Sequence, residues 1–182
     1  LCGDGKFACP ADSGTYFSAD TGKTWIFRPY ETPFTWNLVS DKAGRLFVLR
    51  WYGTNFQLYR STDFGDSWHR IILPDSDPYE DAYRIYVEKD HPLFVVTNRR
   101  IVTSLDGGDT WTSFVFPPGR ALTVGRDTEG NLLAGSFYGI YRRNETNVQW
   151  EELNNGIRAG SIGQVVFTST GSIIVSGIGR WF

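Results

Sequence analysis

The sequence contains no methionine, only two cysteines and no long apolar run. No stretch reaches the roughly 18 apolar residues that a membrane-spanning helix needs, so we expect no membrane span. Neither sign of charge dominates, because 18 basic side chains stand against 20 acidic ones. Binding to nucleic acid usually requires clustered positive charge, and we therefore expect no nucleic-acid partner.

The two cysteines, Cys2 and Cys9, both lie within the first nine residues. In an oxidising compartment they can form a disulfide that clips the N-terminal segment, and otherwise both are unpaired thiols. The chain begins with Leu1 rather than Met, from which we expect a processed chain or a fragment.

Aromatic residues and glycine, by contrast, are abundant. Aromatics make up 16% of the chain, with seven tryptophans, and there are twenty glycines. Aromatic and β-branched residues suit the pleated, half-buried surface of a strand, and glycine suits the turns between strands. No segment of ten or more residues has the apolar period of a helix, so the sequence predicts an all-β chain.

An eight-residue pattern, Ser-x-Asp-x-Gly-x-Thr/Ser-Trp, occurs three times. Its copies, which we call the repeat boxes, occupy residues 18–25, 61–68 and 104–111, and their tryptophans follow one another at intervals of 43 residues. A degenerate copy at 143–150 keeps the tryptophan but loses the serine, aspartate and glycine. This regularity predicts a repeat architecture.

Turn-like tetrads between the boxes lead into short apolar runs, as 41–44 does before 46–49, and this order is typical of hairpins. Each period then holds four strand-sized pieces, which in the second period are 35–40, 45–50, 56–61 and 67–72. Four-stranded antiparallel units of about 40–45 residues are typical of β-propeller blades. The predicted fold is therefore a β-propeller of four-stranded antiparallel blades.

We expect residues 1–182 to form a single propeller domain or a fragment of one. Three strands precede three complete blades and three follow them, which exceeds a closed ring of four blades. Because open blades would expose edges and apolar faces, we expect an arc of a larger propeller. A compact ring with overlapping strands, or an assembly in which partner chains cover the edges, is the alternative. The predicted blades lie near 1–30, 31–73, 74–116, 117–153 and 154–182.

The repeat box resembles the Asp box, or BNR repeat, of β-propellers. Proteins with this repeat include sialidases, sortilin-type receptors, xyloglucanase-like glycosidases and photosystem assembly factors, and the resemblance extends through the repeats over essentially the whole chain. It implies that each box forms the hairpin between the third and fourth strands of a blade. The resemblance is specific for the blade and says little of function, because one fold hosts many activities.

The box residues are predicted to be structural. The aspartate can accept hydrogen bonds from turn amides, the glycine can take a positive φ, and the tryptophan can pack between neighbouring blades. Three carboxylates on three separate blades cannot share one Ca²⁺, and we expect no metal and no other cofactor. The residues concerned are Ser18, Asp20, Gly22, Trp25, Ser61, Asp63, Gly65, Trp68, Ser104, Asp106, Gly108 and Trp111.

In the family that the boxes resemble, ligand sites usually lie on the face opposite the boxes, which carries the second-to-third loops and the links between blades. Exposed aromatic rings there can stack on a ligand, and arginines can hold a carboxylate. The same rings can instead fill the space between blades. The candidate binding residues are Trp51, Tyr52, Arg99, Arg100, Phe137 and Tyr138.

Catalytic constellations are poor. A sialidase needs three arginines, a Tyr–Glu pair and an acid–base Asp, and Arg28 follows a box where the family's arginine motif precedes one. The acidic link 75–81 could bind Ca²⁺, supply a catalytic carboxylate or be a solvated loop, and no second carboxylate opposite it can be identified. His69 and His91 lack a metal-ligand spacing.

The sequence therefore predicts a non-catalytic binding or assembly scaffold outside the cytoplasm, either extracellular or periplasmic. Its expected partner is a protein surface or a glycan, bound on the loop face opposite the boxes. The alternative is a fragment of a sialidase-like or xyloglucanase-like glycoside hydrolase.

Overall fold

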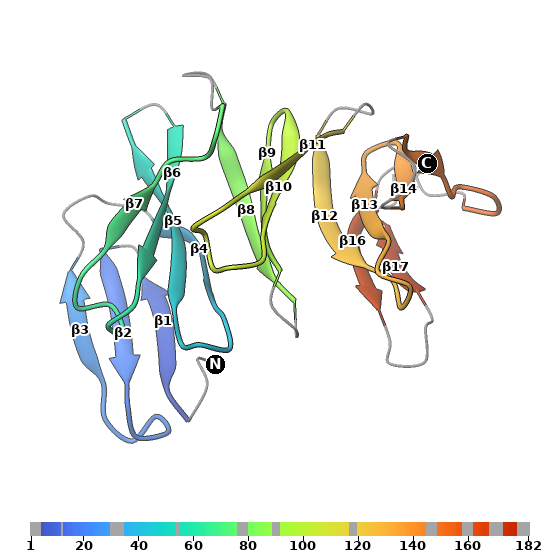
Figure 1. The fold of residues 1–182 in the computed structure, drawn as a ribbon. Coiled ribbons are helices and arrows are strands. Elements are labelled where there is room, and N and C mark those ends of the chain that lie inside the picture. Colours follow the sequence, from blue (N-terminus) through green and yellow to red (C-terminus); the bar gives the residue numbers. More distant parts are fainter. Residues whose placement is uncertain are drawn as a thin grey trace. The chain divides into compact units, whose positions relative to one another are not determined.

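The computed structural model describes residues 5–11, 13–29, 35–53, 55–75, 80–88, 92–116, 120–144, 149–157, 162–167 and 173–177. Every regular element in these residues is a β-strand (Figure 1). The prediction of an all-β chain is confirmed. No helix in the described ranges is long and apolar enough to cross a membrane.

The strands form five sheets, and each sheet contains strands that follow one another in the chain. The first two sheets consist of β1 (Phe7–Ala11), β2 (Gly14–Ser18) and β3 (Ile26–Pro29), and of β4 (Thr35–Ser40), β5 (Leu46–Tyr52), β6 (Asn55–Ser61) and β7 (His69–Ile71). The third sheet consists of β8 (Ala82–Val87), β9 (Leu93–Thr97), β10 (Arg100–Ser104) and β11 (Thr112–Val115). The last two consist of β12 (Ala121–Arg126), β13 (Leu132–Ser136), β14 (Gly139–Arg143) and β15 (Glu151–Glu152), and of β16 (Ile162–Phe167) and β17 (Ile173–Gly177).

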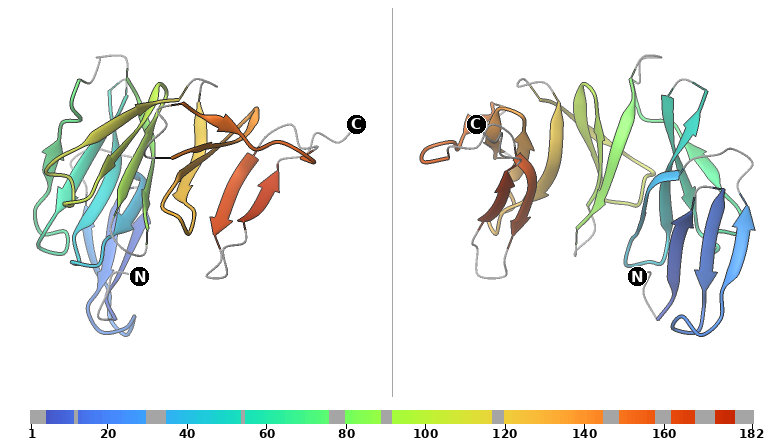
Figure 2. Two further views of the ribbon diagram at one scale, coloured as in Figure 1. Left: turned by 45° about the vertical axis from the view of Figure 1, so that its right-hand side comes forward. Right: turned by 180° about the vertical axis from the view of Figure 1, so that it is seen from behind.

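Spatial order equals chain order in every sheet, so each sheet is an up-and-down meander, which Figure 2 shows from two further sides. Four-stranded meanders of this length are β-propeller blades, and the predicted fold class is confirmed. The strands of the second sheet agree with the predicted pieces to within two residues at each end, and β7 begins at His69, directly after the box. The last of the three strands expected after the third complete blade would fall at 179–182, which lie outside the described residues.

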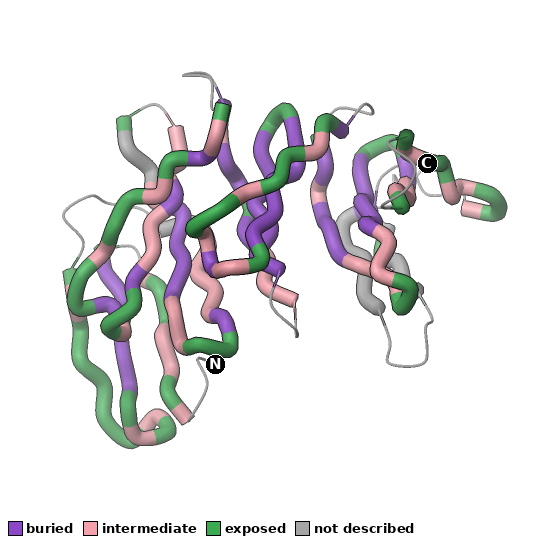
Figure 3. The backbone as a smooth tube through the Cα atoms, in the orientation of Figure 1, coloured by how far each residue is buried: buried purple, intermediate pink, exposed green. Residues whose placement is uncertain are grey.

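The chain divides into two compact units, residues 1–97 with 102–113 and residues 98–101 with 114–182. In the first unit, β5 has four consecutive residues with no exposed surface, 46–49, and 93–96 of β9 are almost as deeply buried (Figure 3). A strand with both faces buried reads as a continuous apolar run rather than as an alternating one. In the first unit, the first and third sheets are the neighbours that bury the two faces of β5.

Two apolar clusters join the sheets of the first unit. Phe17 of β2 packs with Leu46 of β5, and Phe47 and Leu58 of the second sheet pack with Ile85 of β8. The second unit has a smaller cluster around Ile140 of β14 and Ile162 of β16. Burial of these side chains supplies the main stabilisation of each unit, at about 25 cal/mol per Å² of apolar surface.

Cys9 is exposed on β1, and its possible disulfide partner, Cys2, lies outside the described residues. Trp51 and Tyr52 lie at the end of β5, but their side chains are also outside the description.

Truncation of the buried Phe47 tests this account of the core. We expect Phe47→Ala to lower the free energy of unfolding by about 3–5 kcal/mol, because it leaves a cavity between two sheets. Ile26→Ala is the control: Ile26 is 62% exposed, and its truncation should change stability by no more than about 0.5 kcal/mol. Urea unfolding followed by tryptophan fluorescence measures both, and similar losses would contradict the burial assignment.

Candidate functional site

Each repeat box forms a turn whose aspartate accepts hydrogen bonds from the residues around it. Asp63 Oδ1 accepts from the Ser67 N–H at 2.9 Å and from the Ser61 hydroxyl at 2.8 Å. Its Oδ2 accepts from the Ser67 hydroxyl at 2.5 Å. The first and third boxes repeat these contacts around Asp20 and Asp106. The box carboxylates are thus occupied by their own turns.

These donors favour the charged form of each carboxylate. The hydroxyl and amide of Thr24 are the largest causes that lower the pKa of Asp20 to about 2, and those of Ser67 lower the pKa of Asp63 to about 2. The Thr110 hydroxyl and amide likewise lower the pKa of Asp106. All three side chains therefore stay ionised at neutral pH. A general acid must carry a proton at the pH at which it acts, so none of the three can serve as a general acid at neutral pH.

The box serine and glycine bring the turn against the preceding sheet. The Ser61 hydroxyl accepts from the Gly65 N–H at 2.8 Å, and Gly65 has a φ of +87°. A Cβ on Gly65 would lie 2.3 Å from Phe17 Cζ of β2. Only glycine therefore fits at this position, both for its φ and for the approach of the ring.

An arginine of the first sheet holds the second box. Arg28 of β3 donates to the Phe64 carbonyl at 2.6 Å and forms an ion pair with Asp66 at 2.6 Å. The same guanidinium lies 4.8 Å from the centroid of the Phe17 ring. This role makes Arg28 structural in the described chain.

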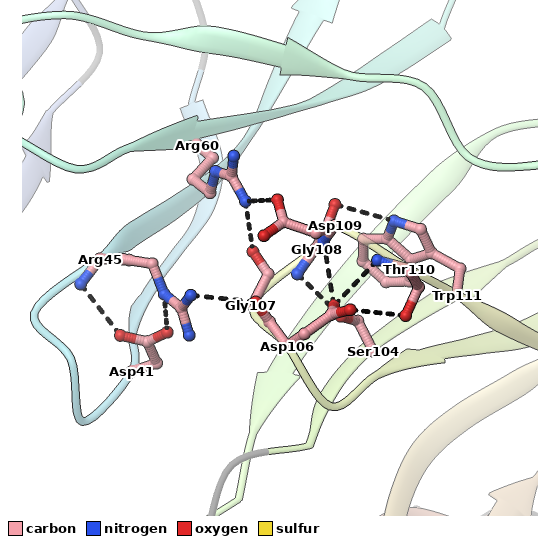
Figure 4. Close-up of polar contacts among 10 residues, drawn as sticks. All are labelled: Asp41, Arg45, Arg60, Ser104, Asp106, Gly107, Gly108, Asp109, Thr110 and Trp111. Carbon is pink, nitrogen blue, oxygen red and sulfur yellow. Dashed lines mark hydrogen bonds and ion pairs between the residues drawn. The ribbon is translucent and has the colours of Figure 1, made fainter.

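Two arginines of the second sheet hold the third box (Figure 4). Arg45 donates to the Asp106 carbonyl at 3.0 Å. Arg60 of β6 donates to the Gly107 carbonyl at 2.9 Å and pairs with Asp109 at 2.5 Å. The Asp109 carboxylate and the carbonyls of Asp106 and Gly107 are therefore also occupied.

The box tryptophans differ in their surroundings. Trp68 packs on the cluster of Phe17 and Leu46, and Trp111 packs on the cluster between the second and third sheets. Trp25 departs from the predicted packing, because it is 46% exposed. In the described residues no sheet precedes β1, and the contacts of Trp25 are within its own sheet: its Nε1–H donates to the Gly22 carbonyl at 3.1 Å, and its ring lies 6.3 Å from the Phe7 ring between centroids.

The degenerate fourth copy retains the packing of its tryptophan within the second unit. Trp150 Nε1–H donates to the Val115 carbonyl at 2.9 Å, and its ring meets Phe116 edge-on with centroids 4.9 Å apart. The tryptophan thus joins β11 even where the serine, aspartate and glycine are lost.

The structure places the predicted binding residues in different settings. Phe137 and Tyr138 form the turn between β13 and β14, and they are 48% and 71% exposed. Arg99 is exposed, whereas Arg100 is only 8% exposed in β10 and cannot offer its side chain to a surface ligand. Of the candidates whose side chains are described, only Phe137 and Tyr138 present adjacent exposed rings.

The acidic link is partly structural. Asp81 Oδ1 accepts from the Phe56 N–H at 2.8 Å, and Glu80 is buried. Residues 76–79 and His91 lie outside the described residues, and His69 is exposed on β7. No group of His, Cys, Asp and Glu in the described ranges could hold a metal ion.

A cavity of about 180 Å³, which we call the loop-face cavity, lies where β6 and β8 begin and β7 and β9 end. These strand ends are remote from the box turn, which joins the other ends of β6 and β7. Its apolar lining comes from Phe56, Leu58, Ile71, Leu73 and Ala82.

The polar lining of the cavity comes from Asn55, Gln57, Arg70, Glu80 and Thr97, with Ile72 beside them. Glu80 and Thr97 are buried, and Arg70 is exposed. Among the described residues that line the cavity, only Glu80 carries a carboxylate, whereas glycosidases typically use two. It is also smaller than the roughly 300 Å³ of ordinary ligand pockets and suits one side chain or ring.

Sequence reasoning missed this cavity. The acidic link pointed to its neighbourhood, but Asn55 and Arg70 follow no motif. Four separate strand ends must meet before their side chains line one space.

Comparisons with known proteins identify relatives in structure. No family model matches the chain, and no curated protein matches it. The extracellular domain of BT4673 from B. thetaiotaomicron is similar with a TM-score of 0.74 and 16% identity, over 97% of this chain and 25% of that one. The fold is a β-propeller.

Two further propellers are similar. YCF48 bound to a D1 peptide has a TM-score of 0.64 and 17% identity over 94% of this chain and 65% of that chain. The GH74 enzyme of Niastella koreensis has a TM-score of 0.64 and 16% identity over 95% of this chain and 26% of its own. The present chain therefore spans about a quarter of the extracellular domain of BT4673 and less than two thirds of the YCF48 chain.

The contact between Gly65 and Phe17 predicts a large effect of one methyl group. Gly65→Ala should lower the free energy of unfolding by about 2–4 kcal/mol, because the positive φ and the displaced ring both oppose it. Gly44→Ala is the matched control: its φ is +77° and a Cβ there meets nothing within 4 Å. The control should lose only about 1–2 kcal/mol from its φ. Equal losses in urea unfolding would show that the second box does not pack on β2.

The lowered pKa of the box aspartates predicts a loss of stability in acid. Each folded pKa lies below the unfolded value of about 3.9, so the stabilisation is complete above that pH and is lost as pH falls toward 2. Asp63→Asn should show a weaker decline of unfolding free energy between about pH 4 and pH 2 than the wild type. Asp75→Asn, outside the boxes, should keep the wild-type decline, and a wild-type decline in Asp63→Asn would contradict this assignment.

Proposed function

We propose that the protein is a non-catalytic binding scaffold of the Asp-box type, which recognises a protein surface or a glycan on the face opposite the repeat boxes. The loop-face cavity carries this proposal, because it combines an apolar floor with polar groups at its rim. Such combinations are typical of sites that bind without chemistry as well as of active sites.

The box geometry supports the assignment to the Asp-box family. Three turns repeat one hydrogen-bond pattern around Asp20, Asp63 and Asp106, and in the second and third sheets the turn joins the third and fourth strands. The described sheets also fall within the five blade ranges that the sequence predicts for one propeller domain over residues 1–182.

Binding is favoured over hydrolysis because Glu80 is the one carboxylate among the described residues that line the cavity. A glycoside hydrolase normally places a second carboxyl group across the scissile bond. Asp81, which follows Glu80, has a structural contact, because its Oδ1 accepts from the Phe56 N–H. The similarity to a GH74 enzyme extends to the fold alone, so the glycosidase alternative gains no specific support.

A protein partner is favoured by one neighbour and by the cavity lining. YCF48 has been solved with a bound D1 peptide, so a propeller of similar fold holds a peptide. The cavity floor is mostly aliphatic, whereas glycans usually stack on flat aromatic rings. An extracellular or periplasmic location is supported by the extracellular domains of BT4673 and BT3049, which have similar folds.

Ligand screening with the purified protein tests the proposal. We expect a ligand from a peptide library or a glycan array to lose at least about tenfold in affinity in Ile72→Glu, because the change replaces an apolar lining residue by a charged one. Ile72 is 72% exposed, so this variant should fold. Ile26→Glu, a change on the exposed first sheet, should bind as the wild type does in calorimetry. Hydrolysis of xyloglucan or of a sialoside, or equal binding by both variants, would contradict the proposal.

A further inference from the structure

We propose that the loop-face cavity binds the C-terminal residue of a protein, with Arg70 holding its carboxylate and the apolar floor holding its last side chain. This inference rests on the proposed function and names the ligand class of that site. It draws on the charge, the size and the position of the cavity.

Arg70 is an exposed cation in the lining of the cavity. In the part of the chain that the structure describes, its guanidinium forms no hydrogen bond or ion pair, whereas Arg28, Arg45 and Arg60 all hold box turns. A planar guanidinium matches a carboxylate in a bidentate fork. The carboxylate of a chain end is one group that this fork fits.

The other polar groups suit the same ligand. The Asn55 side-chain amide makes no hydrogen bond among the described residues. The Gln57 carbonyl oxygen accepts from the Tyr59 hydroxyl at 3.2 Å, which leaves its NH₂ group as a donor. Glu80, the second charged lining residue, is buried and has an interaction of its own.

The apolar floor selects what accompanies the carboxylate. Leu58, Leu73 and Ala82 are each at most 8% exposed. An acidic side chain alone would leave this floor unfilled, and a uronic acid would press unpaired hydroxyl groups against it at a cost in free energy. An aliphatic or aromatic C-terminal residue provides both an apolar group and a carboxylate.

The size and the position of the cavity also favour a chain end. A space of about 180 Å³ holds one side chain, and a terminal residue needs room for the chain to leave in one direction only. β7 is the outermost strand of its sheet in the described residues. An edge strand offers unpaired backbone groups beside which an extended peptide can lie.

The test compares peptides that differ only at their last group. Fluorescein-labelled hexapeptides ending in Val, Leu, Ile or Phe are made with a free carboxylate and with a C-terminal amide, and binding is followed by fluorescence polarisation. We expect the free acids to bind about 10- to 100-fold more tightly than the amides, as for a charged hydrogen-bond pair. Arg70→Gln should abolish this preference and Arg70→Lys should retain part of it.

Arg84→Gln is the matched control, because Arg84 is exposed on β8 and does not line the cavity. It should keep the preference for the free acid. Equal binding of acids and amides, or a preference that survives Arg70→Gln, would overturn the inference. Arg70-dependent binding of oligogalacturonate without binding of the peptides would overturn it in favour of an acidic glycan.

The two proposals can fail separately. Ile72→Glu could weaken binding of the screened ligand while the free acid and the amide of every peptide bind equally. In that case the proposal of a binding scaffold is retained and the proposal of a C-terminal ligand is wrong. If the protein hydrolyses a glycan, the scaffold itself is wrong.

Discussion

A meander of three or four short strands cannot bury both of its faces alone, and the packing of the second and third box turns on the preceding sheets helps to meet this need. Gly65 brings the second box onto Phe17, and Gly108 brings the third onto Ile71. The close approach requires a strained backbone. Phe64 has a φ of 56°, in the left-handed region that costs free energy for a residue other than glycine. Its ring meets Phe17 edge-on with centroids 5.1 Å apart, a contact that offsets the strain locally.

The same packing determines which polar groups are left for a ligand. At the box end, the aspartates are held by their own turns, and the outer carboxylates of Asp66 and Asp109 pair with arginines of the preceding sheet. At the opposite strand ends the boxes impose no such pattern. Arg70 therefore remains available there although it belongs to the same sheet as Arg60. The two ends of one blade differ chemically because only one of them carries a box turn.

Much of this architecture could be predicted because it is local. Short apolar strands separated by turns, together with a box motif at a fixed interval, specify a meander without knowledge of the neighbouring sheets. The cavity could not be predicted in this way, since Asn55, Arg70 and Glu80 converge only after four strand ends meet. Arg100 was predicted as a binding residue because it follows a loop in the sequence. All five residues of β10 are nevertheless buried, and Arg100 is one of them. Burial of a charged side chain depends on what covers it, which a local pattern does not state.

The three boxes share a motif but not an electrostatic setting. Lys23 occupies the position at which the second and third boxes have Asp66 and Asp109. An arginine that pairs with those carboxylates would repel a lysine, so the first box cannot be held in the way that the others are. Trp25, Ile26 and Phe27 are all at least 40% exposed beside it. Identical box residues thus guarantee the same turn, while the variable position between the glycine and the hydroxyl decides which neighbour the turn can accept.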